Sequence, residues 1–136
     1  MKITAVGRID AKTHKAVFRG LRTFNAKFAA RQFREFSVCA KEDGKIVGGA
    51  TGSSKFDWLH VQLLWVDPTC RGKDIGTKVM KRVERIAKKR TCAGIHLETF
   101  SFQALGFYKK LGYTVFGFLP DRPRGHKQYF LLKRLR

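Results

Sequence analysis

The segment from residue 58 to residue 90 constrains the fold more than any other part of the chain. Residues 58–66 are apolar at nearly every position, which predicts a strand buried on both faces. A basic loop containing glycine follows at 70–76, and from Ile75 onward apolar residues recur at helical intervals. A strand that passes through such a loop into an amphipathic helix predicts an α/β fold.

The loop at 70–76 has the properties of a phosphate site. A helix N-terminus leaves backbone N–H groups unpaired and carries a partial positive charge, so it binds anions. Gly72 and Gly76 have no Cβ, which lets backbone N–H groups approach an anion, and Arg71 and Lys73 add formal charge. The spacing fits neither the nucleotide P-loop nor the GxGxxG motif. On these residues alone, an ordinary basic strand-to-helix turn remains the alternative.

The chain is strongly basic, with 29 Lys and Arg against 10 acidic residues and a formal net charge of +19. Such a surface attracts polyanions, and a phosphorylated cofactor, nucleic acid or an acidic protein would each fit. Residues 78–90 alone carry seven basic residues and one acid, on helix faces that the apolar stripe leaves exposed. A solvated basic surface with no dedicated partner stays open as well.

The cysteines and the hydropathy argue against a disulfide-rich, zinc-binding or membrane-spanning protein. The three cysteines are widely spaced and form no CxxC pair, so they indicate neither a disulfide framework nor a zinc site. No apolar run approaches the roughly 18 residues of a membrane span. Residues 1–6 lack the long apolar segment of a signal peptide. We expect a cytoplasmic protein without a metal or a membrane partner.

The remaining pattern predicts one α/β domain over residues 1–136, a mixed sheet with helices on both faces. A first helix follows Asp10 as its N-cap, and a last one spans about 102–111 and ends at Gly112. Residues 42–45 form a hairpin turn, whereas 24–34 stay unassigned, with a second short helix as one interpretation. The expected strands are 2–8, 36–40, 46–51, 58–66, 95–98, 113–118 and 128–132.

Two motifs resemble the GNAT superfamily of N-acetyltransferases. Residues 66–77, VDPTCRGKDIGT, are similar to its acetyl-CoA loop [RQ]-x-x-G-x-[GA], with Arg71 and Gly76 at the first and last positions. Asp74 stands where the family usually has glycine. Because Asp tolerates a left-handed backbone, we expect the loop to keep its shape. An acidic side chain near a pyrophosphate is unfavourable, so we expect somewhat weaker binding of CoA. Residues 99–113, TFSFQALGFYKKLGY, resemble the downstream segment A-x-x-F-Y-x-K-x-G-[FY].

This resemblance covers about 35–136, and it is closest to short bacterial members of the superfamily. It implies a mostly antiparallel sheet with a split between strands 4 and 5, into which CoA inserts. The implied reaction moves an acetyl group from acetyl-CoA to a primary amine by direct attack in a ternary complex. The residues that it places on the cofactor are Leu64, Trp65, Val66, Arg71, Gly72, Lys73, Asp74, Ile75, Gly76 and Thr77.

The resemblance also assigns catalytic roles. Tyr108 stands where the family's tyrosine protonates the departing thiolate. A lone tyrosine is more often a core aromatic, but the basic loop about thirty residues upstream favours the catalytic role. His60 and Glu98 are the candidate bases; His60 could instead be a hydrogen-bonded core residue, and Glu98 could cap a helix or pair with an arginine. The loop at 120–126 either borders the acceptor site or is an exposed connector.

Two other functions stay open at this point. One is a non-catalytic GNAT-like basic module that binds RNA or DNA, and the other is an acetyltransferase that acts on aminoacyl-tRNA. The acceptor, a small-molecule or protein amine, is not specified by the sequence. We expect a monomer or a homodimer.

Overall fold

The computed structural model describes residues 1–70 and 72–136, which form two compact units, Met1–Gln32 and Phe33–Arg136. Each unit is described by itself, and a single domain over 1–136 stays a prediction. The elements are α1 (Ala11–Asn25), β1 (Arg34–Glu42), β2 (Lys45–Lys55), β3 (Trp58–Val66), a short 3₁₀ turn (Pro68–Cys70), α2 (Ile75–Lys89), β4 (Gly94–Phe100), α3 (Leu105–Lys110), β5 (Thr114–Pro120) and β6 (Lys127–Arg134). None of the helices in the described residues is long and apolar enough to cross a membrane.

The N-terminal unit consists of α1 and the segments that flank it. The Asp10 carboxylate caps the helix as predicted, because it accepts hydrogen bonds from Thr13 N at 3.0 Å and from Thr13 Oγ1 at 2.7 Å. The predicted strand at 2–8 is wrong: these residues join no ladder, and the alternation of Ile3 with polar neighbours is too weak to replace a partner strand. Residues 26–28 form a turn, so α1 is not followed by a second short helix.

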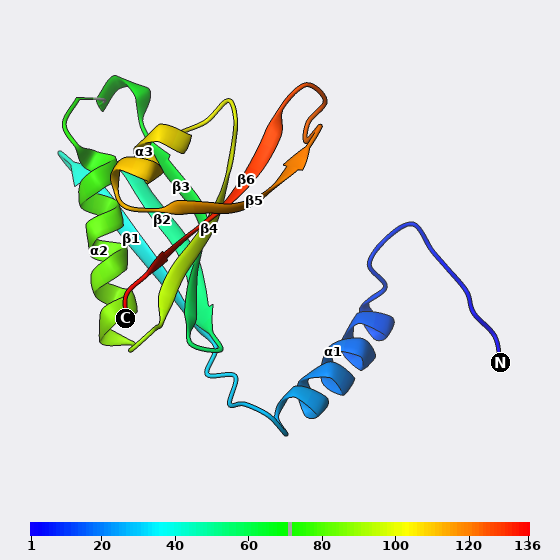
Figure 1. Ribbon diagram of the computed structural model, residues 1–136. Helices are drawn as coiled ribbons and strands as arrows, with labels where there is room; N and C mark the ends of the chain where they lie inside the picture. The colour runs from blue at the N-terminus through cyan, green and yellow to red at the C-terminus, as the bar shows by residue number, and fades with distance from the viewer. Residues whose placement is uncertain (71) are drawn as a thin grey trace. The chain divides into compact units, whose positions relative to one another are not determined.

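The second unit is built on a six-stranded sheet in the order β1-β2-β3-β4-β6-β5 (Figure 1). Four of its five strand pairs are antiparallel, and only β3 and β4 run parallel, which confirms the mixed, mostly antiparallel sheet. The parallel pair is short, since Trp58–Val61 pairs with Gly94–Leu97 and the two strands then separate. This is the predicted split, between the fourth and fifth strands of the sequence-based count and between β3 and β4 here.

Two residues with left-handed backbone explain the hairpin that joins β1 to β2. Asp43 and Gly44, between β1 and β2, both have positive φ values, +50° and +76°. A two-residue turn of this kind matches the twist of the adjacent strands. The predicted hairpin at 42–45 is therefore confirmed.

The apolar stripe of α2 packs on the sheet. Ile75, Val79 and Val83 are buried, and they join buried side chains of β3, β4 and β6 in one core, of which Leu59, Ile95 and Leu131 are fully enclosed. Fully burying such aliphatic side chains stabilises a fold by roughly 1.5–3 kcal/mol each. The basic residues of α2 lie on the remaining faces: Lys78, Lys81, Arg82, Arg85, Lys88 and Lys89 are exposed.

Arg90 does not share that exposure. Its guanidinium donates hydrogen bonds to the carbonyl oxygens of Arg34 and Glu35 and to the Ser54 hydroxyl. It therefore ties the end of α2 to β1 and β2 instead of adding to the open basic face.

The prediction that 58–66 is buried on both faces is wrong: the first half of the strand is buried on one face, whereas Trp58 and His60 on the other face are only partly buried. Leu59 and Val61 are buried, whereas Leu63 and Trp65 are 69% and 53% exposed. The reason is the split, because residues of β3 beyond Val61 have no neighbour on the β4 side. The apolar side chains of this half border a cavity instead of a core.

Helix α3 lies next to α2. A Cβ added at Gly76 would come within 3.1 Å of the Phe107 ring, so glycine allows the two helices to approach closely. The helix is shorter than the predicted 102–111, because the Gln103 side chain accepts a hydrogen bond from Phe100 N and holds the preceding residues in a turn. Gly112 follows the helix with φ +94°, as its predicted C′ role requires.

Candidate active site

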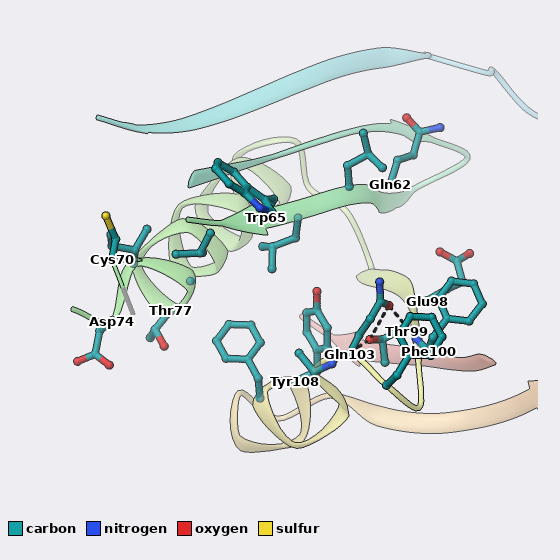
Figure 2. A pocket seen from close by; sticks show the side chains of 18 of the residues that line it. Gln62, Trp65, Cys70, Asp74, Thr77, Glu98, Thr99, Phe100, Gln103 and Tyr108 are labelled. Atoms are coloured by element: carbon teal, nitrogen blue, oxygen red, sulfur yellow. Dashed lines mark hydrogen bonds between the residues drawn. The ribbon is translucent and has the colours of Figure 1, made fainter. Parts of the chain in front are cut away.

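A cavity of about 910 Å³ lies in the split between β3 and β4, within the size range of small-molecule sites. Figure 2 shows Asp74 and Thr77 at one end, Glu98 and Phe100 at the other, and Tyr108 between them. The first end is lined by Leu64, Trp65, Val66, Cys70, Gly72, Asp74, Ile75, Gly76 and Thr77. The second end is lined by Gln62, Leu63, Glu98, Thr99, Phe100, Phe102, Gln103 and Gln128.

The start of α2 presents backbone donors to the first end. The first helical hydrogen bond runs from Lys78 N to Asp74 O at 3.0 Å. The N–H groups of Ile75, Gly76 and Thr77 precede it and have no acceptor within the helix. All three residues line the cavity. Such unpaired donors and the helix dipole favour a bound anion, but the predicted phosphate site stays a prediction.

Asp74 adopts the backbone that the sequence analysis anticipated. It is the N-cap of α2, with φ +57° and ψ +28°, in the left-handed region where glycine is common and aspartate is tolerated. Its carboxylate makes no capping hydrogen bond and is exposed. The departure from the family glycine therefore leaves the loop shape intact and adds a negative charge beside the donors.

The two basic side chains of the loop are placed differently. Lys73 pairs with Glu42, with its Nζ 3.2 Å from both carboxylate oxygens, and it does not line the cavity. Arg71 lies outside the described residues, so its predicted role stays a prediction. Backbone groups, and not the lysine, are the donors that face the cavity here.

Tyr108 extends from α3 into the cavity, toward β3 (Figure 2). Its side chain is only 6% exposed, and this burial raises the pKa of the phenol to about 12. The shift keeps the hydroxyl protonated across the physiological range, as a proton donor requires. Tyr113 packs edge-on against it, 6.0 Å between ring centroids, and burial raises the pKa of that phenol too.

The structure brings the two candidate bases together. His60 Nε2 lies 2.8 Å and 3.1 Å from the two oxygens of Glu98, although 38 residues separate them in sequence. Both side chains are half-buried, and Glu98 lines the cavity whereas His60 does not. Glu98 therefore lines the cavity while its carboxylate is held by His60, which lies outside the lining.

His96 completes this group, and the sequence analysis missed it. Its ring stacks on that of His60 with centroids 4.5 Å apart and planes 5° apart. Burial lowers the pKa of His96, and His60 lowers it further, whereas Glu98 raises it. His96 and Glu98 stand two residues apart, so the sequence places them on the same face of a strand. Their link to His60 could not be predicted, because it depends on the pairing of His60 with His96 across two parallel strands.

His60, His96 and Glu98 each offer one ligand atom within 4.8 Å of the others, so they could approach a metal ion. The lone pairs of an imidazole lie in its ring plane. Since the two rings are nearly parallel, their nitrogens do not converge on one point. The arrangement suits the hydrogen bond that joins His60 to Glu98 better than a metal site.

The loop between β5 and β6 contacts the turn that follows β4. His126 Nδ1 lies 3.2 Å from Ser101 Oγ, and Lys127 N donates to the same hydroxyl at 3.1 Å. The ring of His126 meets that of Phe102 edge-on, at 5.0 Å. Residues 120–126 are exposed, and none of them is among the residues that line the cavity, so a role of this loop at the acceptor site stays a prediction.

Comparison with known proteins agrees with this geometry. The profile of the Acetyltransferase (GNAT) family matches residues 8–113. Blasticidin-S acetyltransferase of Streptomyces morookaense is 41% identical over 95 residues, 69% of this chain and 70% of the relative. Acetyltransferase Atu2258 of Agrobacterium fabrum is 33% identical over 127 residues, 92% of this chain and 93% of the relative. A crystal structure of an acetyltransferase from Bacillus cereus has TM-score 0.89 and 35% identity, covering 97% of this chain and 98% of the other.

The chain therefore belongs to the acetyltransferase (GNAT) family. Its fold and its relatives make it an acetyl-CoA-dependent N-acetyltransferase. These comparisons give no support to a non-catalytic module that binds RNA or DNA, or to aminoacyl-tRNA as the acceptor.

Proposed function

We propose that the protein acetylates the primary amine of a small molecule by direct attack on acetyl-CoA within a ternary complex. The observation that carries the proposal is the shared cavity, in which helix N-terminal donors, Tyr108 and Glu98 lie in sequence from one end to the other. These groups meet the three needs of the reaction: an anion site, a proton donor and a proton acceptor.

The cofactor end would hold acetyl-CoA through backbone groups. The N–H groups of Ile75, Gly76 and Thr77 would bind its pyrophosphate. The unpaired edge of β3 at Leu64, Trp65 and Val66 would pair with the pantetheine arm, because that edge has lost β4 as its neighbour. A backbone N–H of this edge would polarise the thioester carbonyl and stabilise the oxyanion.

Glu98 would accept the proton of the attacking amine, directly or through a water molecule. As the amine nitrogen bonds to the carbonyl carbon, its proton passes to the carboxylate. The His60 N–H, donated at 2.8 Å, fixes the orientation of that carboxylate. His96 in turn holds the His60 ring by stacking, so it is a positioning residue.

Tyr108 would give its proton to the leaving group. The C–S bond breaks, its electron pair stays on sulfur, and the phenol protonates the thiolate of CoA. The raised pKa of Tyr108, about 12, keeps the acid form available. A later proton exchange with solvent restores both residues.

The relative that acts on blasticidin S supports a small antibiotic-like amine as the acceptor. We infer that no metal takes part, because a hydrogen bond already joins His60 to Glu98 and the two histidine rings do not converge. Prolonged chelation with EDTA should therefore leave kcat unchanged. A loss that zinc restores would contradict this part of the proposal.

The proposal as a whole is tested by acetyl transfer. Acetyl-CoA should raise the melting temperature, by ligand linkage, and should be consumed with a panel of amines screened by mass spectrometry. The panel includes blasticidin S, aminoglycosides, polyamines and protein lysines. Binding of acetyl-CoA without transfer to any amine, together with micromolar binding of tRNA, would overturn the enzyme function.

A further inference from the structure

Phe100 and Phe102 line the acceptor end of the cavity and form an aromatic cluster with His126, which contacts Phe102 but does not line the cavity itself. The rings of Phe100 and Phe102 are stacked, with centroids 5.3 Å apart and planes 10° apart, and His126 meets Phe102 edge-on. Phe102 is nevertheless 56% exposed. A stacked pair that leaves aromatic surface open beside a binding cavity is suited to receive a further planar ring.

Gln128 provides a polar group next to this cluster. It lines the cavity, is only 8% exposed, and its side-chain oxygen has no hydrogen-bond partner among the described residues. Leaving a buried acceptor unpaired is costly, and each such group calls for an explanation. An N–H donor on a ligand would satisfy it.

The sheet register relates these groups to the proposed base. Gln128 on β6 pairs directly with Phe100 on β4, so the two side chains lie on the same face of the sheet. Glu98 stands two residues earlier on β4 and shares that face, roughly 6.6 Å away along the strand. An amine that reaches Glu98 can therefore carry its ring to Phe102 through a linker of only a few bonds.

We propose that the acceptor is an amine attached by a short linker to a planar ring that bears an N–H donor. The ring stacks on the Phe100–Phe102–His126 cluster, and its N–H donates to the side-chain oxygen of Gln128. The primary amine then lies at Glu98. This inference rests on the proposed function and names the substrate class of the same site.

The test uses three primary amines that share one linker and differ in the ring: 2-aminopyrimidine, phenyl and cyclohexyl. The first is planar with an N–H, the second is planar without one, and the third is neither. We expect kcat/KM to fall in that order. Each step should be at least about threefold, because stacking and a satisfied buried acceptor each contribute this much or more.

Variants test which residue causes each difference in kcat/KM between the amines. Phe102→Leu should remove the preference for phenyl over cyclohexyl, whereas the matched control Phe56→Leu, in the β2–β3 turn and away from the cavity, should keep it. Gln128→Met should remove the preference for aminopyrimidine over phenyl. Gln128→Glu retains an acceptor oxygen and should keep that preference, which separates the hydrogen bond from a general loss of packing.

Equal kcat/KM for the three amines, or variants that change all three equally, would overturn the inference while leaving the proposed function intact. If none of the three is acetylated, their dissociation constants, measured by calorimetry in the presence of CoA, must show the same order. Equal or absent binding would overturn the inference. Ordered binding without transfer would instead count against the proposed function.

Discussion

The two ends of the cavity are built in different ways. In the proposed function, the groups that act at the cofactor end are backbone N–H groups of the α2 start and the free edge of β3. At the acceptor end they are side chains, chiefly Glu98, Phe102 and Gln128, delivered by β4, β6 and the turn after β4. Tyr108 stands between the two (Figure 2).

This difference determines at which positions of the site the amino acid can change without loss of function. Backbone groups are available to almost any side-chain sequence that keeps the loop shape, so the cofactor end tolerates Asp74 in place of glycine. The acceptor end depends on residue identity at each position. Substitutions should accordingly have large effects at the side-chain end and at Tyr108, and small ones in the loop.

The largest effect is expected for Glu98→Gln. The amide keeps the shape of the carboxylate but cannot accept a proton, so kcat should fall by about 10³-fold, within the usual range for a lost general base. The dissociation constant of acetyl-CoA should stay unchanged, because Glu98 lies at the other end. Steady-state kinetics together with calorimetry checks both values, and near-normal turnover would show that water alone removes the proton.

Tyr108→Phe should lower kcat by about 10²-fold, since the ring is retained and only the proton donor is lost. Acetyl-CoA should bind as before. With a pKa of about 12, the wild-type phenol keeps its proton up to that value, so Tyr108 should cause no fall in kcat between about pH 7 and about pH 10. A basic limb that vanishes in the Phe variant would contradict the assigned pKa shift.

Salt should have a moderate effect, confined to the encounter with acetyl-CoA. The exposed lysines and arginines of α2 follow directly from the phosphate site and should steer the phosphates toward it. Since the Debye length falls from about 30 Å at 0.01 M salt to about 8 Å at 0.15 M, kcat/KM for acetyl-CoA should drop roughly threefold to tenfold. Turnover at saturation should stay nearly flat.

Charge reversal shows whether this steering is local. Lys78→Glu with Lys81→Glu should lower kcat/KM at low salt more than the matched pair Lys88→Glu with Lys89→Glu, which is also exposed but lies at the C-terminal end of α2. An equal effect of the two pairs would mean that only the net charge of +19 matters.

The smallest effect is expected for Asp74→Asn. Asparagine also tolerates the left-handed backbone, so the loop keeps its shape and loses one negative charge beside the pyrophosphate site. Acetyl-CoA should bind about threefold more tightly, the size expected when one exposed charge is removed. Weaker binding, measured by calorimetry, would show that the carboxylate has a positive role.

The elements at the cofactor end could be predicted because the residues that define them are contiguous in the sequence. The bounds of β3, the start of α2 and the position of Tyr108 follow from residues that are neighbours in the sequence, and the structure confirms the first two. The acceptor end joins His60 to Glu98 and Phe100 to Gln128 across strand pairs. A register between distant strands leaves no local pattern, so His96 and Gln128 were missed.

The wrong predictions, on the burial of β3 and on a strand at 2–8, also arise from contacts between distant parts of the chain. Leu63 and Trp65 made β3 look fully buried, because an apolar run does not reveal whether its neighbour is a strand or a cavity. Residues 2–8 have a weak strand pattern but no strand to pair with. In both cases the deciding fact is a partner elsewhere in the chain.

The short parallel pairing of β3 with β4 has a consequence for the cooperativity of the fold. Amide protons of β3 that point toward the split should exchange with solvent quickly in the free enzyme and slowly once the pantetheine arm takes the place of the missing strand. In the proposed binding mode the ligand would extend the pairing of β3 where β4 leaves it. The split should therefore resist proteolysis better as the concentration of the coenzyme rises.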